Sequence, residues 1–210
     1  MDVDAKWRMI SEQRVVLADL AAALPAGDLD RPSLCGRWRV RDVVAHVAFT
    51  PRSPGLPRIL AAAVRARGDF DEVNRVMAVG HADRLGAGVA AELRAVAPLR
   101  DKPAITTLDN LVFDTLVHVQ DVALPLGLEV TPPLDGLRAG AERVWRMGWP
   151  FWARRRLRGL QLVATDTSWV RGDGEPVHGS IRDLLLLLTG RTQAALPRLE
   201  GPGVRRLATT

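Results

Sequence analysis

Apolar residues recur at helical spacing in several separate stretches of this chain. Across residues 5–24 (AKWRMISEQRVVLADLAAAL) they stand three or four positions apart, and PAGD follows, which predicts a first amphipathic helix. Within RVRDVVAHVAF, residues 39–49, the four valines fall on one helical stripe. Asp42 lies in the first turn of this segment, where the helix dipole favours an acid. We therefore predict a second helix that ends before TPRSPGLP.

The middle of the chain continues the helical pattern. We expect a polar-studded helix over residues 58–67 and another from Phe70 into the nineties, interrupted near Gly86. A long helix over residues 104–124 is stopped by PLG and TPPLDG, and a further helix covers residues 133–147. Strand signals are almost absent before residue 158, so these substantial helices, joined by loops, predict an up-and-down four-helix bundle.

The C-terminal part of the chain has a different pattern. LQLVATDTSWV is rich in strand-forming residues, and GDGEPV is a turn. In SIRDLLLLLTGR, Ser180 and Asp183 form a capping arrangement before an apolar run that Gly190 closes. We therefore divide the chain into a helical bundle over residues 1–152 and a small strand-helix appendage over residues 153–210. The predicted fold class is mainly α with a small C-terminal α/β part.

The bulk composition is that of one globular unit. The chain has 210 residues, of which 47% are hydrophobic and 25% are charged, and a chain of this size can bury a real core. It has no apolar run of about 18 residues, and its polar, acidic start does not resemble a secretory signal. Cys35 is the only cysteine, which excludes an internal disulfide and a multi-cysteine zinc knuckle. We expect a cytoplasmic protein that does not associate with membranes.

The net charge of +5 comes almost wholly from arginine, because Lys6 and Lys102 are the only lysines. A basic balance of this size favours an acidic ligand or nucleic acid. No nucleic-acid-binding motif accompanies it, and the aromatic residues are not interleaved with the basic ones. We therefore do not expect nucleic-acid binding.

One polar stripe interrupts the apolar helix of residues 104–124. At 100° per residue, Asn110, Asp114, His118 and Asp121 share a stripe about 80° wide. A solvent-exposed face would explain this stripe, but there is no Lys or Arg between residues 103 and 137, in a chain with 29 basic residues. The helix is therefore expected to be largely interior, where a carboxylate or an imidazole needs a partner.

A divalent metal ion is one such partner, and hydrogen bonding among buried polar groups is the other. A carboxylate and an imidazole one helical turn apart can bind the same ion, and a third ligand from another helix would complete the set. His46 is the best third candidate because it lies about 60° from Val43, at the edge of the apolar stripe of its helix. The spacing alone leaves both alternatives open.

Two motifs carry a resemblance to a known family. SLCGRWRVRDVVAHVAF resembles the N-terminal signature of the mycothiol-dependent maleylpyruvate isomerase family, a branch of the DinB-like bundles, and DTLVHVQDVALPLG resembles its second signature. The tail from residue 164 is similar to the C-terminal segment often attached to these bundles. The resemblance implies a DinB-like fold in which His46, Asp114 and His118 bind a zinc-type divalent ion. The family pattern has Glu at the position of Asp114.

The resemblance also implies a chemistry. In this family the ion activates a low-molecular-weight thiol, mycothiol or a similar one, for isomerisation of a small electrophile or for thiol transfer onto it. We expect a small-molecule substrate, which could be anionic, and a homodimer is a possible assembly. The alternatives are a bundle that binds a metal or a small ligand without catalysis, and a helical interaction module without metal. Catalytic residues are not assigned.

A few further residues have specific expectations attached to them. Arg154 and Arg155, in WARRRLRG, could receive an anionic substrate or the carboxylates of the thiol cofactor, although such clusters are more often solvated helix ends. Asp121 is either an acceptor that orients His118 or a polar residue at a helix end. We expect Cys35 to be a half-buried structural thiol more readily than a reactive one, and His81 to be exposed.

Overall fold

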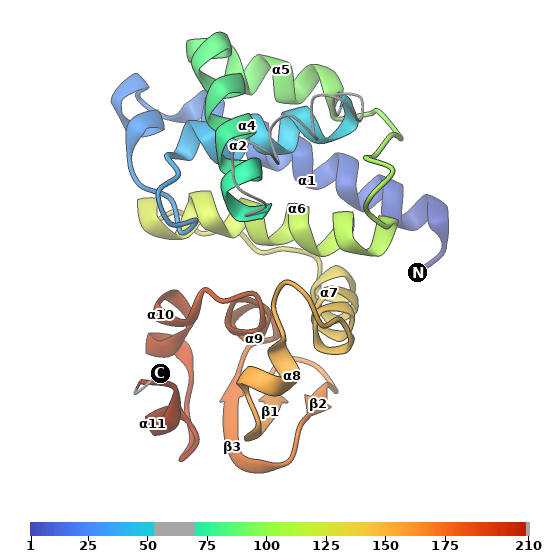
Figure 1. The fold of residues 1–210 in the computed structure, drawn as a ribbon, viewed down its shortest axis with the longest axis vertical. Coiled ribbons are helices and arrows are strands. Elements are labelled where there is room, and N and C mark those ends of the chain that lie inside the picture. The colour runs from blue at the N-terminus through green and yellow to red at the C-terminus, as the bar shows by residue number, and fades with distance from the viewer. Residues whose placement is uncertain (53–69, 209–210) are drawn as a thin grey trace. The chain divides into compact units, whose positions relative to one another are not determined.

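The computed structural model describes residues 1–52 and 70–208 (Figure 1). The helix expected over residues 58–67 lies outside the described residues. The chain forms two compact units. The N-terminal unit comprises Asp2–Leu111 and His118–Val130, and the C-terminal unit comprises Thr131–Thr210 together with Val112–Val117 and Met1.

All the regular elements of the N-terminal unit are helices over its described residues. Its elements are α1 (Val3–Ala23), η1 (Ala26–Asp30), α2 (Val40–Phe49), η2 (Thr50–Arg52), α4 (Phe70–Leu85), η3 (Gly86–Gly88), α5 (Val89–Val96), η4 (Leu124–Leu126) and both ends of α6 (Leu108–Ala123), whose middle, Val112–Val117, is counted with the C-terminal unit. The break between α4 and α5 falls where the sequence predicts it, because Gly86 adopts a left-handed conformation with φ of 55° that glycine tolerates best.

Side-chain caps fix where the long helices begin. Asp2 accepts a hydrogen bond from the backbone N–H of Ala5 at the start of α1, and Thr107 accepts one from Asn110 at the start of α6. Each bond satisfies a backbone donor that has no partner within the helix. The long helix expected over residues 104–124 therefore begins four residues later than predicted, after the threonine that caps it.

The core of the N-terminal unit is built around α2. Helices α1, α4 and α5 all pack against it. The four valines of its predicted stripe are fully or almost fully buried, so the expected apolar face of this helix is confirmed. Leu17 of α1, Leu93 of α5 and Val119 of α6 belong to the same hydrophobic cluster. Burying apolar side chains of this size contributes about 1.5–3 kcal/mol each.

The C-terminal unit combines short helices with one small sheet. Its elements are α7 (Leu134–Arg146), α8 (Ala153–Arg156), β1 (Gly159–Ala164), β2 (Val170–Arg171), β3 (Gly174–Gly179), α9 (Ile181–Leu188), α10 (Thr192–Ala195), η5 (Leu196–Arg198) and α11 (Val204–Leu207). The strand order is β2-β1-β3: β1 is antiparallel to β2, with Leu162 opposite Arg171, and parallel to β3, with Leu162 opposite Val177.

Helix α9 is the most apolar element of this unit. Every residue from Leu184 to Leu188 is buried, and α9 packs against α7 and against the strands. The predicted cap is present, because the Ser180 hydroxyl accepts a hydrogen bond from the Asp183 N–H at 3.2 Å. Gly190 closes the helix in a left-handed conformation, as predicted.

The mainly α fold with a small C-terminal α/β part is thus confirmed. Among the described residues, none of the helices is long and apolar enough to cross a membrane.

Candidate metal centre

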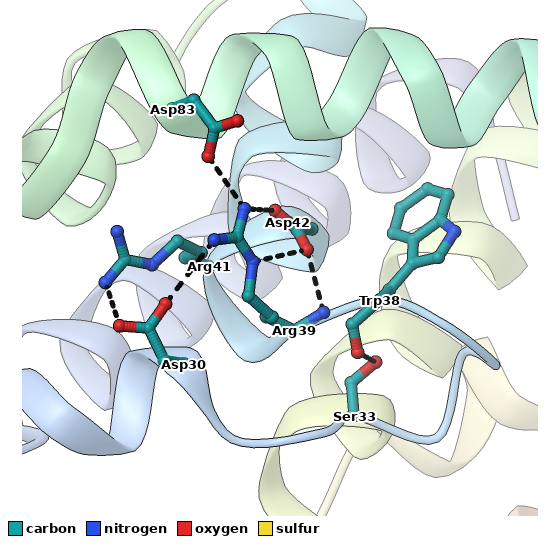
Figure 2. Close-up of polar contacts among 7 residues, drawn as sticks. All are labelled: Asp30, Ser33, Trp38, Arg39, Arg41, Asp42 and Asp83. Carbon is teal, nitrogen blue, oxygen red and sulfur yellow. Dashed lines mark hydrogen bonds and ion pairs between the residues drawn. The ribbon is translucent and has the colours of Figure 1, made fainter.

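The loop that precedes α2 is held in one conformation by its own hydrogen bonds. The Ser33 N–H and the Ser33 hydroxyl both donate to the Trp38 carbonyl at 3.0 Å, and the hydroxyl accepts from the Cys35 N–H at 3.1 Å (Figure 2 draws the bond from the hydroxyl to the carbonyl). The Trp38 N–H donates back to the Cys35 carbonyl at 3.0 Å. This closed turn fixes the directions of Cys35 and Trp38 relative to the first residue of α2.

The same loop is tied to α6. The Leu34 N–H donates to the Asp121 carbonyl at 3.0 Å, although the two residues are far apart in the chain. The Cys35 Sγ then lies 3.0 Å from Asp121 Oδ2 and 3.8 Å from His118 Nδ1. The loop therefore brings the only cysteine of the chain against the polar stripe of α6.

Asp121 orients the His118 ring. Its Oδ2 lies 2.9 Å from His118 Nδ1, and Asp121 and His118 are 0% and 7% exposed. A carboxylate only accepts hydrogen bonds, so the contact favours the imidazole tautomer with the proton on Nδ1. The Nε2 lone pair is then directed elsewhere and can serve as a ligand. This is the role expected of an acceptor behind a metal-binding histidine.

Three aromatic rings meet at this point. The His46 ring of α2 and the His118 ring of α6 are 5.0 Å apart between centroids, with an interplanar angle of 75°. The Trp38 indole lies edge-on to His46 at 5.3 Å and parallel to His118 at 6.4 Å. The indole therefore lies against both imidazoles and limits their rotation.

Among the described residues, two groups of side chains could hold a metal ion. One consists of His46, Asp114 and His118, and the other of Cys35, His118 and Asp121. In each group one ligand atom per residue lies within 4.8 Å of the others. The three residues that the sequence singled out thus come together, and the burial of His118 and Asp121 rules out a solvent-exposed stripe.

The donor set of the first group suits a divalent metal. Two imidazoles and one carboxylate are the ligands of many zinc and non-haem iron sites, which keep further positions open. His118 also has the carboxylate behind it that such ligands need. The residues present therefore fit the ion that the sequence resemblance implies.

A cluster of ion pairs fixes the start of α2 (Figure 2). The buried Asp42 carboxylate accepts hydrogen bonds from the Arg39 backbone N–H at 2.8 Å and from its guanidinium Nε and Nη2 at 3.0 and 2.8 Å. Arg39 also donates to Asp83 of α4 at 2.8 Å. The hydrogen bonds to Asp42, and then to Asp83, raise the pKa of the Arg39 guanidinium above its ordinary value. Asp42 thus caps the helix that carries His46.

The environment of His81 differs from the sequence expectation. His81 is half-buried rather than exposed, because its ring packs at 5.6 Å from that of Phe49, and its Nδ1 lies 3.0 Å from Arg84 Nη2. Burial, followed by the charge of Arg84, lowers the pKa of His81. Its spacing in the sequence gives no sign of this contact with the end of α2.

The arginines of α8 differ in their exposure and in their hydrogen-bond partners within the C-terminal unit. Arg154 and Arg155 are exposed, and their cofactor-binding role stays a prediction. Arg156 donates to the carbonyls of Leu187 and Leu188 at 2.7 and 3.1 Å, which satisfies acceptors at the end of α9. Burial lowers the pKa of Arg156.

Comparison with known proteins finds a family model that matches the N-terminal part of the chain. Residues 10–104 match the family model of the mycothiol maleylpyruvate isomerase N-terminal domain. The crystal structure of the mycothiol-dependent maleylpyruvate isomerase is similar, with a TM-score of 0.61 and 16% identity over 96% of this chain and 93% of that one. A histidine-to-alanine variant of that isomerase gives a TM-score of 0.62 and 15% identity over the same shares. No curated protein matches the chain significantly. At these identities, the two structures establish a common fold.

Proposed function

We propose that this chain, whose residues 10–104 match the family model of the mycothiol maleylpyruvate isomerase N-terminal domain, is a metal-dependent thiol enzyme of that family. In this proposal His46, Asp114 and His118 bind one divalent ion, and the ion activates mycothiol or a similar low-molecular-weight thiol. The thiol then isomerises a small electrophile or is transferred onto it. The observation that carries the proposal is the convergence of these three side chains from α2 and α6.

Zinc is the ion that the ligands favour. Two imidazoles and a carboxylate leave at least one position open, and zinc accepts this ligand set without a strict geometric preference. When bound, such an ion supplies Lewis acidity, which lets a thiol ionise near neutral pH. Asp114 is one methylene shorter than the glutamate of the family pattern, so its carboxylate reaches less far from α6.

The chain's own residues prepare this site. Asp121 keeps the proton of His118 on Nδ1 and thereby directs the Nε2 lone pair away from itself. Trp38 packs on both imidazoles and restricts their rotation. The Arg39–Asp42 pair holds the start of the helix that carries His46. Together these contacts hold the ligands in place before an ion binds, which lowers the ordering cost of binding.

The substrate class follows from the family and from the charge. One solved structure of the same fold is that of the mycothiol-dependent maleylpyruvate isomerase, so we infer a small electrophile as the substrate of this chain. Its net charge of +5 suits an anionic substrate. Arg154 and Arg155 are the proposed, weaker contacts for carboxylates of the substrate or of the thiol.

Elemental analysis of gently purified protein tests the metal site. We expect about one ion per chain in the wild type and less than a tenth of that in His118→Ala. His178→Ala is the matched control, because His178 lies on β3 and belongs to neither ligand group. The absence of an ion in the wild type, even after zinc is added, would overturn the proposal.

Thiol-dependent turnover of the electrophile, followed by product analysis, tests the chemistry, because isomerisation regenerates the thiol and only transfer consumes it. With mycothiol and a panel of electrophiles that includes maleylpyruvate, the wild type should turn over, and His46→Ala should lose activity by at least about a hundredfold. Asp114→Glu should keep the ion and its activity, because it restores the family residue. An ion that binds stoichiometrically without any thiol turnover would support the non-catalytic alternative, a metal-binding bundle.

A further inference from the structure

We propose that the chain has a second position for a thiophilic divalent ion, formed by Cys35, His118 and Asp121, and that its use excludes the first. This inference goes beyond the proposed function, because neither the thiol chemistry nor the first ligand group needs the cysteine. The ligand class is a divalent cation with affinity for sulfur, such as zinc, cobalt or cadmium.

The three ligand atoms are already gathered. Cys35 Sγ lies 3.0 Å from Asp121 Oδ2 and 3.8 Å from His118 Nδ1, and His118 Nδ1 lies 2.9 Å from Asp121 Oδ2. Asp121 is fully buried, His118 is buried and Cys35 is half-buried. All three residues belong to the N-terminal unit.

The approach of Cys35 is fixed by backbone contacts. The Leu34 N–H donates to the carbonyl of Asp121, and the Ser33 hydroxyl accepts from the Cys35 N–H. The sulfur is therefore held beside α6 by two bonds that do not involve its own side chain. A site with its ligands held in this way loses less entropy on binding than one that must be assembled.

The charges also suit a cation. A thiolate and a carboxylate carry two negative charges, which a divalent ion neutralises, and the imidazole completes a mixed sulfur, nitrogen and oxygen set. When the ion binds, the thiol proton of Cys35 leaves to solvent, and the imidazole proton moves from Nδ1 to Nε2 of His118. No oxidant or reductant is needed.

The two positions exclude each other because they share His118. A neutral imidazole has one lone-pair nitrogen at a time. The first position uses Nε2 and requires the proton on Nδ1, where Asp121 accepts it. The second position uses Nδ1 and requires the proton on Nε2. The chain is thus expected to bind one ion, at either place, and an ion bound by Cys35 deprives the first group of its His118 ligand.

Cobalt titration of the full chain tests this inference, since a thiolate bound to Co²⁺ gives a near-ultraviolet charge-transfer band that imidazole and carboxylate ligands do not give. His46→Ala disables only the first position and should bind one cobalt with a strong charge-transfer band. Cys35→Ser disables only the second and should bind one cobalt without it. The double variant His46→Ala/Cys35→Ser should bind none at the same concentration.

A second measurement follows the thiol itself. Cys35 is the only cysteine of the chain, so its reaction with an alkylating reagent reports one site. In His46→Ala, cadmium should slow the alkylation of Cys35 at least tenfold, and in His46→Ala/His118→Ala it should not. Circular dichroism of each variant verifies folding, and His46→Asn replaces His46→Ala if the latter does not fold.

The outcomes separate this inference from the proposed function. A folded His46 variant that shows neither a thiolate band nor protection of Cys35 overturns the second position, whatever the thiol assay gives. A wild type without thiol turnover, together with a clear thiolate band in His46→Ala, overturns the proposed enzyme and keeps the second position.

Discussion

Replacing Arg39 by methionine should destabilise the N-terminal unit by about 2–3 kcal/mol. Methionine keeps much of the aliphatic stem but removes the guanidinium hydrogen bonds to Asp42, whose side chain is 1% exposed, and to Asp83. Removing one partner of a buried ion pair typically costs about 3–5 kcal/mol, because the other charge stays buried. The Arg39 side chain is 34% exposed, so water screens part of the pair and the expected cost is smaller.

The stability lost on replacing each partner of Arg39 should increase with the burial of that partner. Asp83 is 57% exposed, so Asp83→Asn should cost less than about 1 kcal/mol. The double variant Arg39→Met/Asp42→Asn should be about 1 kcal/mol more stable than Arg39→Met. Asparagine removes the unpaired charge and can still accept a hydrogen bond from the backbone N–H of residue 39.

Urea unfolding of the metal-free proteins, followed by circular dichroism, measures these differences, and a thermal midpoint lower by about 5–10 °C should accompany Arg39→Met. If Arg39→Met unfolds within about 0.5 kcal/mol of the wild type, or if Asp83→Asn costs as much as Arg39→Met, the buried pair with Asp42 does not anchor α2 and the reasoning is refuted.

In a Cys35→Ser background, which leaves only the first ligand group, Asp121→Asn should weaken zinc binding about 10–100-fold in competition with a chromophoric chelator; a change below threefold would show that the carboxylate does not orient His118. Gly140→Ala should destabilise the protein by about 1–3 kcal/mol in urea unfolding, because the added Cβ would lie 2.9 Å from the Cβ of Phe113 in α6. Gly80→Ala should instead stabilise the protein by about 0.5–1 kcal/mol, because Gly80 lies within α4 and its added Cβ would meet nothing within 4 Å. Because burial lowers the pKa of His81, the unfolded state binds this proton more readily, so stability should fall as the pH drops below about 6.5, the ordinary histidine value. His81→Gln should flatten that slope in unfolding curves measured at several pH values, and an unchanged slope would contradict the assignment.

Much of the fold is predictable because it depends on relations within single elements. The valine stripe of α2, the break at Gly86 and the Ser180 cap are all set by residues a few positions apart, whose geometry a helix or a turn fixes. The same logic places Asp114 and His118 one turn apart on α6. The lack of basic residues around that helix indicates its burial, and the structure confirms it for His118 and Asp121.

Contacts between different helices are harder to predict from the sequence. The sequence selects His46 as a partner of His118, but neither periodicity nor spacing can give the 5.0 Å between their rings. The spacing of His81 predicts an exposed residue, and the ring of Phe49 that half-buries it lies on another helix. Local spacing gives Arg39 no partner on another helix, and only the packing of α4 shows that it also binds Asp83.

The sequence by itself determined the helical class of this protein, the approximate bounds of its main helices and three candidate ligands of the proposed metal site, since each follows from local periodicity. Only the tertiary structure decided that the Cys35 loop lies against α6, because the bond from Leu34 to Asp121 joins residues that no local pattern relates. Together with the bond from the Cys35 N–H to Ser33, that backbone contact holds the sulfur beside the buried carboxylate and imidazole, on which the proposed choice between two positions for one ion depends.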